Sequence, residues 1–293
     1  MTPDWVAVDW GTSSLRLWAI KDGEAVDERR SDQGMGRLTP DGFEPTLLAQ
    51  LGDWLPDSGR LNVLICGMAG AKQGWHEAPY RGVPCPPSGL GVRADARDPR
   101  LKVRILPGLC QMDPLDVMRG EETQIAGLLA LNPGFDGQVC LPGTHSKWAR
   151  VAGGLVQEFT TFMTGELFDV LAKHSILRLS MGEGWDAPAF LRAVTEACDA
   201  PLSTQLFRLR AGALLSGLSP DSARARLSGL LIGSELSAVE ATGPVAVIGD
   251  NRLVGLYSEA MRALGRRPMV YSGRELALSG LIRAYDTALE DHL

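Results

Sequence analysis

The chain has 293 residues, which suggests about two domains, each large enough for its own core. Hydrophobic residues make up 45% and charged residues 22%, as in an ordinary globular protein. The formal net charge of −6 and the lack of a basic run argue against nucleic acid or an anionic membrane as the main partner.

Cysteine usage and apolar runs predict a cytoplasmic protein without a membrane partner. The five cysteines are scattered, include no Cys-x-x-Cys pair and leave an odd count, so reduced thiols are expected in place of disulfides or a zinc site. The N-terminus has no basic region followed by an apolar stretch, and no apolar run approaches the ~20 residues of a membrane helix.

The first predicted element is a hairpin at residues 6–20, in which two apolar runs flank a polar turn. The turn residues with ligand-binding chemistry are Asp9, Gly11, Thr12, Ser13 and Ser14. Glycine lets the backbone approach a ligand, the hydroxyl and N–H groups are donors, and a carboxylate suits the water shell of a divalent cation. We therefore predict Asp9 as the metal residue, and Gly11, Thr12 and Ser13 as phosphate contacts. An ordinary hairpin is the alternative, because these residue types are common in turns.

The chain then predicts a third strand, a flexible loop, a helix and a buried strand. Their ranges are 24–30, 33–36, 43–55 and 62–66. Gly34 is a candidate for close backbone approach to a substrate. Gly70 follows the buried strand, where it either borders a ligand crevice or belongs to a bare turn.

Residues 73–82 are irregular and rich in aromatic and polar groups, which predicts a loop that caps a small-molecule pocket. Trp75 and Tyr80 are its candidate substrate contacts. His76 and Glu77 form no metal site of the helical type, because the second histidine is absent. Another buried strand is predicted at 101–106.

Two carboxylates mark the start of a helix after Gly120. Glu121 and Glu122 lie in its first turn, where the helix dipole would keep a carboxylate ionised and able to accept a proton. Capping of the helix is the alternative role. Because this helix leads directly to a second hairpin, we expect its start to reach the active-site cleft and one of the pair to be the catalytic base.

The second hairpin, at residues 138–151, repeats the pattern of the first, and a third strand again follows. Its predicted phosphate contacts are Gly143, Thr144, His145 and Lys147. A lysine there lowers the cost of bringing anionic oxygens together, whereas a solvated lysine is the alternative. The repeat predicts two duplicated lobes, 1–135 and 136–293, closing on one nucleotide.

The remaining elements are mostly helical. Thr164 fits an N-cap of the next helix, and Glu166 either caps that helix or points into the cleft. Helices are expected over 187–218, 221–240, 253–264 and 273–289, with strands at 244–248 and 269–271. Gly249 follows the first of these strands in a turn.

Other nucleotide and hydrolase motifs are missing from the sequence. It contains no P-loop, no Gly-x-Gly-x-x-Gly, no Gly-x-Ser-x-Gly and no His-Glu-x-x-His. The prediction that the protein binds a nucleotide therefore depends on the paired hairpins.

Six blocks in both predicted lobes carry a family resemblance. They read Val-Asp-Trp-Gly-Thr-Ser-Ser-Leu-Arg at 8–16, Gly-Trp-x-x-Ala-Pro-Tyr at 74–80, Pro-Gly-Leu-Cys at 107–110, Met-Arg-Gly-Glu-Glu-Thr-Gln at 118–124, Pro-Gly-Thr-His-x-Lys-Trp at 142–148 and Met-Thr-Gly-Glu-Leu at 163–167. Together they resemble the 2-dehydro-3-deoxygalactonokinase family of the sugar kinase, actin and heat-shock ATPase superfamily.

The resemblance implies an α/β fold of two duplicated ribonuclease-H-like lobes with a central nucleotide and substrate cleft. It implies ATP- and Mg²⁺-dependent phosphorylation of the 6-hydroxyl of 2-dehydro-3-deoxy-D-galactonate, in galactonate catabolism. Glu122 matches the catalytic aspartate of related sugar kinases by its place, with Glu121 as the second choice. Gly249 falls where the superfamily seats adenosine, although Asp250 replaces the usual second glycine and leaves the adenine contacts open.

The sugar-acid contacts are predicted to be Arg119, Trp75, Tyr80 and Gln124, with Arg119 as the partner of the substrate carboxylate. Three alternatives remain: a kinase for another keto-deoxy sugar acid, an ATPase or phosphatase of the same fold, and a sugar-responsive regulator. A regulator would need a DNA-binding appendage, and the first strand begins by Val6. The preferred stereoisomer and the oligomeric state, including a homodimer, stay open.

Overall fold

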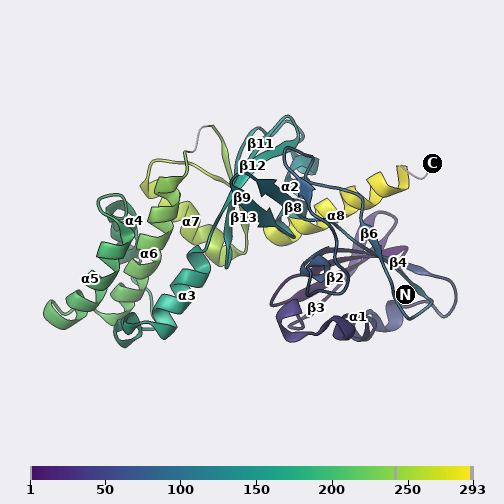
Figure 1. The fold of residues 1–293 in the computed structure, drawn as a ribbon, viewed down its shortest axis with the longest axis horizontal. Helices are drawn as coiled ribbons and strands as arrows, with labels where there is room; N and C mark the ends of the chain where they lie inside the picture. The colour runs from purple at the N-terminus through teal and green to yellow at the C-terminus, as the bar shows by residue number, and fades with distance from the viewer. Residues whose placement is uncertain (1, 241–242, 291–293) are drawn as a thin grey trace. The chain divides into compact units, whose positions relative to one another are not determined.

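The computed structural model describes residues 2–240 and 243–290, without the side chains of residues 289 and 290. The chain forms two compact units (Figure 1). The first comprises residues 1–135, 151–159 and 273–293, and the second comprises residues 136–150 and 160–272. By packing, the last helix belongs to the first unit, whereas the predicted lobes, 1–135 and 136–293, place it in the second. These lobes stay a prediction of the functional division.

The first unit is built on a six-stranded sheet in the order β3-β2-β1-β4-β7-β6. Its strands are β1 (Trp5–Trp10), β2 (Leu15–Lys21), β3 (Glu24–Ser31), β4 (Leu61–Gly67), β6 (Val92–Ala94) and β7 (Leu101–Ile105). The first three strands form an antiparallel meander, while β4 joins β1 and β7 joins β4 in parallel. β1 and β4 are buried almost throughout, as expected for strands covered on both faces.

Alternation along β1 divides its side chains between two cores. Val6 and Val8 pack with α1 (Phe43–Leu51) on one face, and Trp5 and Ala7 pack with α8 (Gly273–Glu290) on the other. The last helix, yellow in Figure 1, also lies beside α2 (Glu121–Leu131). These two helices approach so closely that a Cβ on Gly127 would lie 2.0 Å from the carbonyl oxygen of Leu276.

A small sheet of three strands was not predicted from the sequence. It consists of β5 (Arg81–Gly82), β8 (Leu109–Met112) and β9 (Leu115–Met118), in the order β5-β8-β9. The β8–β9 hairpin is followed directly by Arg119 and Gly120, which precede the start of α2 at Glu121. The short 3₁₀ helices of the chain are η1 (Met35–Arg37), η2 (Pro40–Gly42), η3 (Gly52–Trp54), η4 (Met68–Gly70) and η5 (Ile176–Ser180).

The second sheet repeats the strand order of the first. It runs β12-β11-β10-β13-β14, as β3-β2-β1-β4-β7 does in the first sheet. Its strands are β10 (Gly137–Leu141), β11 (Ser146–Ala152), β12 (Leu155–Phe162), β13 (Val245–Gly249) and β14 (Met269–Ser272). β13 pairs in parallel with both β10 and β14. The predicted duplication is confirmed: the protein has the α/β fold of two ribonuclease-H-like lobes found in actin-like ATPases.

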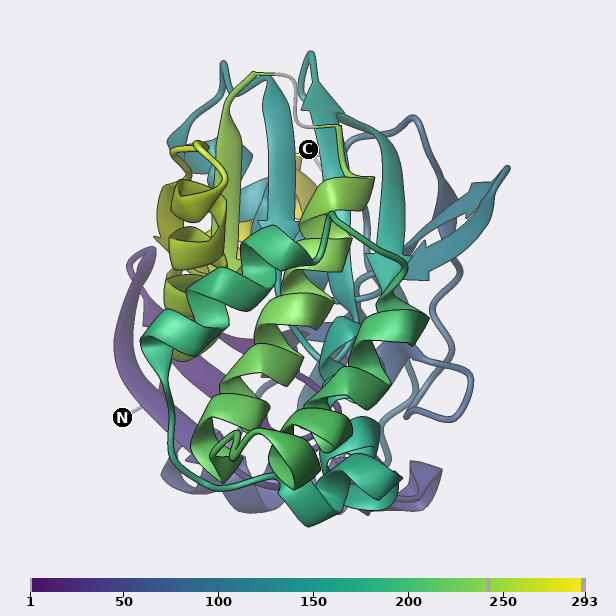
Figure 2. The ribbon, with the colours of Figure 1, turned by 90° about the vertical axis from the view of Figure 1, so that its left-hand side faces the viewer.

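The second unit carries most of the helices. They are α3 (Thr164–His174), α4 (Ala187–Glu196), α5 (Leu202–Leu215), α6 (Pro220–Ala238) and α7 (Asn251–Ala263). The helices between residues 187 and 238, green in Figure 2, lie side by side as a layer over the sheet. Apolar side chains of α4 and α6 share one core with those of β10, β11 and β13. None of the helices in the described part of the chain is both long and apolar enough to span a membrane.

Two sequence-based expectations about helix ends are wrong in detail. The first helix was expected to continue to residue 55, but α1 ends at Leu51 because Gly52 takes a φ of +47°. Thr164 was expected to be the N-cap of α3, but Met163 holds that position. The Thr164 hydroxyl instead donates a hydrogen bond to the buried carboxylate of Glu235.

Candidate active site

The first polar loop connects β1 to β2. Asp9, half-buried near the end of β1, pairs in register with Arg16 on one side and Cys66 on the other. The N–H of Gly11 donates to the carbonyl of Ser14 at 2.9 Å, which closes the turn. Residues 12–14 are exposed, so their hydroxyl groups are accessible to a ligand.

The segment at Gly34 packs on this loop through backbone hydrogen bonds. The N–H of Met35 donates to the carbonyl of Gly11 at 3.0 Å, and that of Gly36 donates to the carbonyl of Thr12 at 2.9 Å. A Cβ on Gly34 would lie 2.3 Å from the Thr12 oxygen, so no larger residue fits. The close approach expected of Gly34 is therefore made to the loop itself, and its substrate contact stays a prediction.

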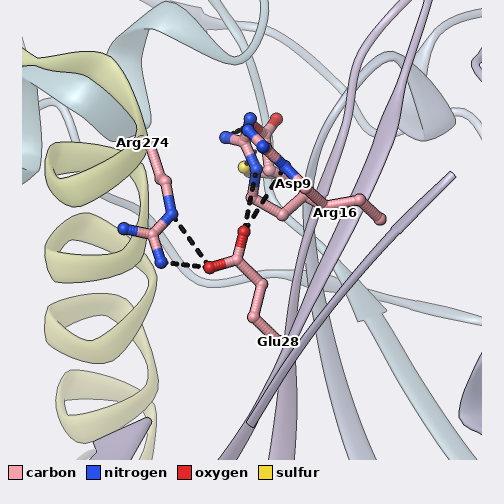
Figure 3. Close-up of polar contacts among 6 residues, drawn as sticks. Asp9, Arg16, Glu28 and Arg274 are labelled. Atoms are coloured by element: carbon pink, nitrogen blue, oxygen red, sulfur yellow. Dashed lines mark hydrogen bonds and ion pairs between the residues drawn. The ribbon is translucent and has the colours of Figure 1, made fainter. Parts of the chain in front are cut away.

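A chain of charged side chains leads away from Asp9 (Figure 3). Nη1 of Arg16 lies 3.8 Å from Asp9 Oδ2, and Nε of Arg16 lies 3.5 Å from Glu28 Oε1. Arg274, on the first turn of α8, donates from Nε to Glu28 Oε2 at 2.9 Å. Burial raises the pKa of Asp9 and the Arg16 charge opposes that rise, whereas Arg274 lowers the pKa of Glu28. No role was predicted from the sequence for Arg16, Glu28 or Arg274, because they lie far apart along the chain.

The two acids at the start of α2 differ in exposure. Glu122 is 1% exposed, and it accepts hydrogen bonds from the Gly120 N–H at 2.6 Å and the Thr123 hydroxyl at 2.9 Å. Glu121 is partly exposed and accepts from the Arg119 N–H at 3.0 Å. Burial, followed by the charge of Glu121, raises the pKa of Glu122 to about 8. The expectation that the helix dipole holds Glu122 ionised is therefore wrong, because burial outweighs it.

Arg119 is a buried cation, 8% exposed. Its Nη2 donates to the Ala78 carbonyl at 2.7 Å, and its guanidinium lies 4.4 Å from the Tyr80 ring centroid. Within residues 2–240 and 243–290, Nε and Nη1 of Arg119 have no hydrogen-bond partner. A Cβ on Gly70 would lie 2.7 Å from Nη1, so the glycine makes room for the guanidinium. Predicted contacts Arg119, Tyr80 and Gly70 are thus brought together beside the two acids.

Two other predicted substrate residues of the first unit, Trp75 and Gln124, are not shown in contact with Arg119, Tyr80 or Gly70. Trp75 meets Trp10 edge to face at a centroid distance of 6.4 Å and packs on the core. It also lines a surface hollow of about 550 Å³ with His76, and neither Arg119 nor Tyr80 belongs to the lining of that hollow. Gln124 is half-buried on α2.

The second polar loop connects β10 to β11. His145 and Glu166 were predicted for different ligands, yet His145 Nε2 lies 2.6 Å from Glu166 Oε2. The Glu166 N–H also donates to the Thr144 carbonyl at 2.9 Å. Lys147 is 5% exposed, which excludes the solvated lysine that the sequence left open. The start of α3 is thus attached directly to this loop.

Gly249 ends β13 near the beginning of the same loop. A Cβ on it would lie 3.7 Å from the Pro142 carbonyl oxygen. Asp250 caps α7 by accepting from the N–H groups of Arg252 at 3.0 Å and Leu253 at 3.1 Å. The cap gives Asp250 a structural role at the start of α7.

The donor set near Asp9 fits Mg²⁺ bound through few protein ligands. The described part of the chain contains no group of three or more His, Cys, Asp or Glu side chains arranged to hold a metal. Mg²⁺ in nucleotide sites usually keeps several waters and takes one or two carboxylates together with substrate phosphates. A single half-buried carboxylate beside an exposed hydroxyl-rich turn matches that pattern.

The duplicated fold, with one glycine- and hydroxyl-containing loop in each unit and two acids at a helix start, defines an actin-like ATPase or sugar kinase. The chain belongs to the 2-keto-3-deoxy-galactonokinase family, whose sequence model matches residues 9–284. The family resemblance inferred from the sequence is confirmed.

Individual relatives cover nearly the whole chain. A Rhizobium meliloti (strain 1021) protein named as a 2-dehydro-3-deoxygalactonokinase is 43% identical over 294 residues, covering 96% of each chain. The 2-dehydro-3-deoxygalactonokinase of Escherichia coli (strain K12) is 33% identical over 273 residues, covering 90% of this chain and 91% of its own. A crystal structure from Sinorhizobium meliloti, named for the same kinase, is 39% identical with a TM-score of 0.88, covering 97% of this chain and 99% of its own.

Proposed function

We propose that the protein transfers the γ-phosphoryl group of ATP to the 6-hydroxyl of 2-dehydro-3-deoxy-D-galactonate. The products are 2-dehydro-3-deoxy-6-phospho-D-galactonate and ADP. The observation that carries this proposal is Arg119, a buried guanidinium whose Nε and Nη1 lack partners in the described residues, beside the acids of α2. Its planar donor groups match the carboxylate of a sugar acid, which a neutral sugar lacks.

ATP is proposed to bind through both polar loops. Its phosphates meet the residues of the two turns, which are Gly11, Thr12, Ser13, Gly143, Thr144, His145 and Lys147. The adenosine lies near Gly249. Asp9 would hold Mg²⁺, which would neutralise charge on the phosphates when bound.

Glu122 is proposed as the general base, with Glu121 as the second choice. Its carboxylate takes the proton of the 6-hydroxyl, the freed oxygen attacks the γ-phosphorus, and ADP leaves with the bonding electron pair. A base works best when its pKa lies near the working pH, which the pKa of about 8 at Glu122 satisfies. Closure of the protein around both substrates excludes water and suppresses ATP hydrolysis.

The sugar acid is proposed to bind with its carboxylate on Arg119. Tyr80 supports the guanidinium through the face of its ring. The other proposed contacts of the sugar acid are Gly34, Gly70, Trp75, Gln124 and Glu166.

A coupled ADP-release assay tests the reaction across a panel of keto-deoxy sugar acids and neutral sugars. We expect ADP release to require a sugar acid and to be fastest with 2-dehydro-3-deoxy-D-galactonate. ADP release at the same rate without any sugar acid would instead identify an ATPase of the same fold. A faster reaction with another keto-deoxy acid would reassign the substrate.

The cellular setting also stays a prediction. We propose a cytoplasmic enzyme that acts on small molecules, with no nucleic-acid or membrane partner, either as a monomer or as a homodimer. Light scattering of the purified protein decides between the two oligomeric states.

A further inference from the structure

The second unit contains a buried carboxylate that the proposed reaction does not use. Glu235, on α6, is 2% exposed. Its Oε1 accepts from Trp148 Nε1 at 2.8 Å, and its Oε2 accepts from the Tyr257 hydroxyl at 2.7 Å and from the Thr164 hydroxyl. The Tyr257 oxygen lies 2.8 Å from the Ser146 hydroxyl.

The proton positions in this cluster are determined by its members. The indole of Trp148 only donates, and Tyr257 and Thr164 donate to the carboxylate, so Ser146 donates to the Tyr257 oxygen. Glu235 thus receives three donors, and every buried polar atom of the cluster has a partner. Burial raises the pKa of Glu235, while the hydrogen bonds from Thr164, Tyr257 and Trp148 oppose that rise.

The groups that Glu235 holds flank the second polar loop on both sides. Ser146 and Trp148 adjoin Lys147 at the start of β11, and Thr164 is the first residue of α3. The next residue, Gly165, packs on the loop so closely that a Cβ would lie 2.4 Å from the Gly143 carbonyl oxygen. The following residue, Glu166, is bonded to Thr144 and paired with His145.

We infer that Glu235 is a positioning residue for nucleotide binding. It fixes β11 and the start of α3 against α6, and so holds the donors of the loop from Gly143 to Lys147 in the geometry that receives phosphate. The inference rests on the proposed function, because it assumes that this loop binds ATP. Removing the carboxylate leaves buried donors unpaired and releases both sides of the loop.

The chemistry of the cluster predicts a graded series of variants. In Glu235→Gln, the amide oxygen still accepts from Trp148, and the amide N–H groups donate to the Thr164 and Tyr257 oxygens. The Tyr257 hydroxyl then donates to the Ser146 oxygen, because either atom of that pair can be the donor. Glu235→Leu removes all three bonds at similar volume. Tyr257→Phe and Thr164→Val each remove one donor and nearly preserve shape.

Equilibrium binding of ATP with Mg²⁺, measured without sugar acid, tests the inference. Because misplaced charge-assisted donors weaken a phosphate contact, we expect the Kd to rise about tenfold or more in Glu235→Leu. The two single-donor variants should each raise it roughly two- to fivefold, and Glu235→Gln should stay within about twofold. In steady state, the KM for ATP should rise by a larger factor than the KM for the sugar acid, for which Glu166 is one of several proposed contacts. The indole N–H resonance of Trp148 should move further in Glu235→Leu, which removes the acceptor, than in Glu235→Gln, which keeps a neutral acceptor.

Gln205→Leu is the matched control in the same unit. This buried side chain donates to the carbonyls of Ala197 at 3.4 Å and Ala200 at 2.7 Å, away from the loop. It should lower the melting temperature without changing the Kd for ATP.

The inference is wrong if Glu235→Leu, at matched loss of melting temperature, binds ATP as tightly as the wild type does. If Glu235→Leu does not fold, unchanged ATP affinity in Tyr257→Phe and Thr164→Val overturns it instead. A wild-type protein that binds no ATP rejects the proposed function, which separates the two failures.

Discussion

In the first unit, the polar loop after β1 lies beside a chain of charged side chains, whereas in the second unit the loop after β10 lies over a buried hydrogen-bonded cluster. The contrast is sharpest at one position, five residues after each loop glycine: Arg16 follows Gly11, and Trp148 follows Gly143. Arg16 lies between Asp9 and Glu28, while Trp148 donates to Glu235. Corresponding positions of the duplicated fold thus stabilise the two loops in different ways, by ion pairs in the first unit and by buried hydrogen bonds in the second.

The difference follows from what each loop is proposed to hold. An acid, Asp9, lies near the end of β1 just before the first loop, and the neighbouring cation Arg16 stabilises its ionised carboxylate against burial. The second loop contains no acid and presents donors with Lys147, so a well-packed support that fixes their geometry is enough. Two loops with the same place in a duplicated fold are therefore supported by different neighbours, a charged chain in the first unit and a hydrogen-bonded cluster in the second.

The largest expected effect tests whether Glu122, in the first unit, is the acid that accepts the proton. Glu122→Gln should lower kcat by about 10²- to 10⁴-fold, because it removes the proton acceptor, with little change in ATP affinity. Single-turnover phosphorylation with saturating ATP measures this. Near-normal turnover in that variant would remove Glu122 from the mechanism and leave Glu121 as the base.

The next largest effect concerns the buried cation of the first unit. Arg119→Met should raise the KM for the sugar acid by roughly 10²-fold, and Arg119→Lys by less, because lysine keeps the charge and loses the planar fork. Arg93→Met, at an exposed arginine of the same unit, is the matched control. Equal effects on the KM for ATP and for the sugar acid would contradict the assignment of Arg119 to the carboxylate.

The pH dependence of kcat/KM distinguishes the two acids of α2. Because burial and the Glu121 charge place the pKa of Glu122 at about 8, its ionised fraction and kcat/KM should rise with pH and level off above about 8. Glu121→Gln removes the neighbouring charge that raises the pKa of Glu122, so this rise in kcat/KM should move to lower pH. A profile measured from pH 6 to 9.5 in both proteins tests this. An unmoved profile, or loss of activity in Glu121→Gln, would contradict it.

The smallest expected effect concerns Glu28, and it distinguishes the ion pairs beside the first loop from the buried hydrogen bonds beside the second. Glu28→Gln breaks a half-exposed ion-pair chain, so it should raise the KM for ATP only about two- to fivefold. Added salt should reproduce part of this effect in the wild type, because it screens exposed charges. Asp53→Asn breaks a comparable surface pair with Arg29 and should leave the KM unchanged. An effect as large as that of Glu235→Leu would mean that both loops depend equally on their neighbours.

The repeated hairpins could be predicted from the sequence alone, because alternation and turn residues are local signals. The hairpins predicted the α/β fold of two duplicated lobes, and the six sequence blocks predicted the family. Gly120 before two glutamates was likewise a local signal for the start of α2.

Which side chains meet could be learned only from the folded chain. Arg16, Glu28 and Arg274, or Trp148, Thr164 and Glu235, are far apart in sequence and become neighbours through sheet pairing and helix packing. The raised pKa of Glu122 also depended on burial, which no local pattern reports. Local spacing specifies elements, whereas contacts, burial and charge environment are properties of the whole packed chain.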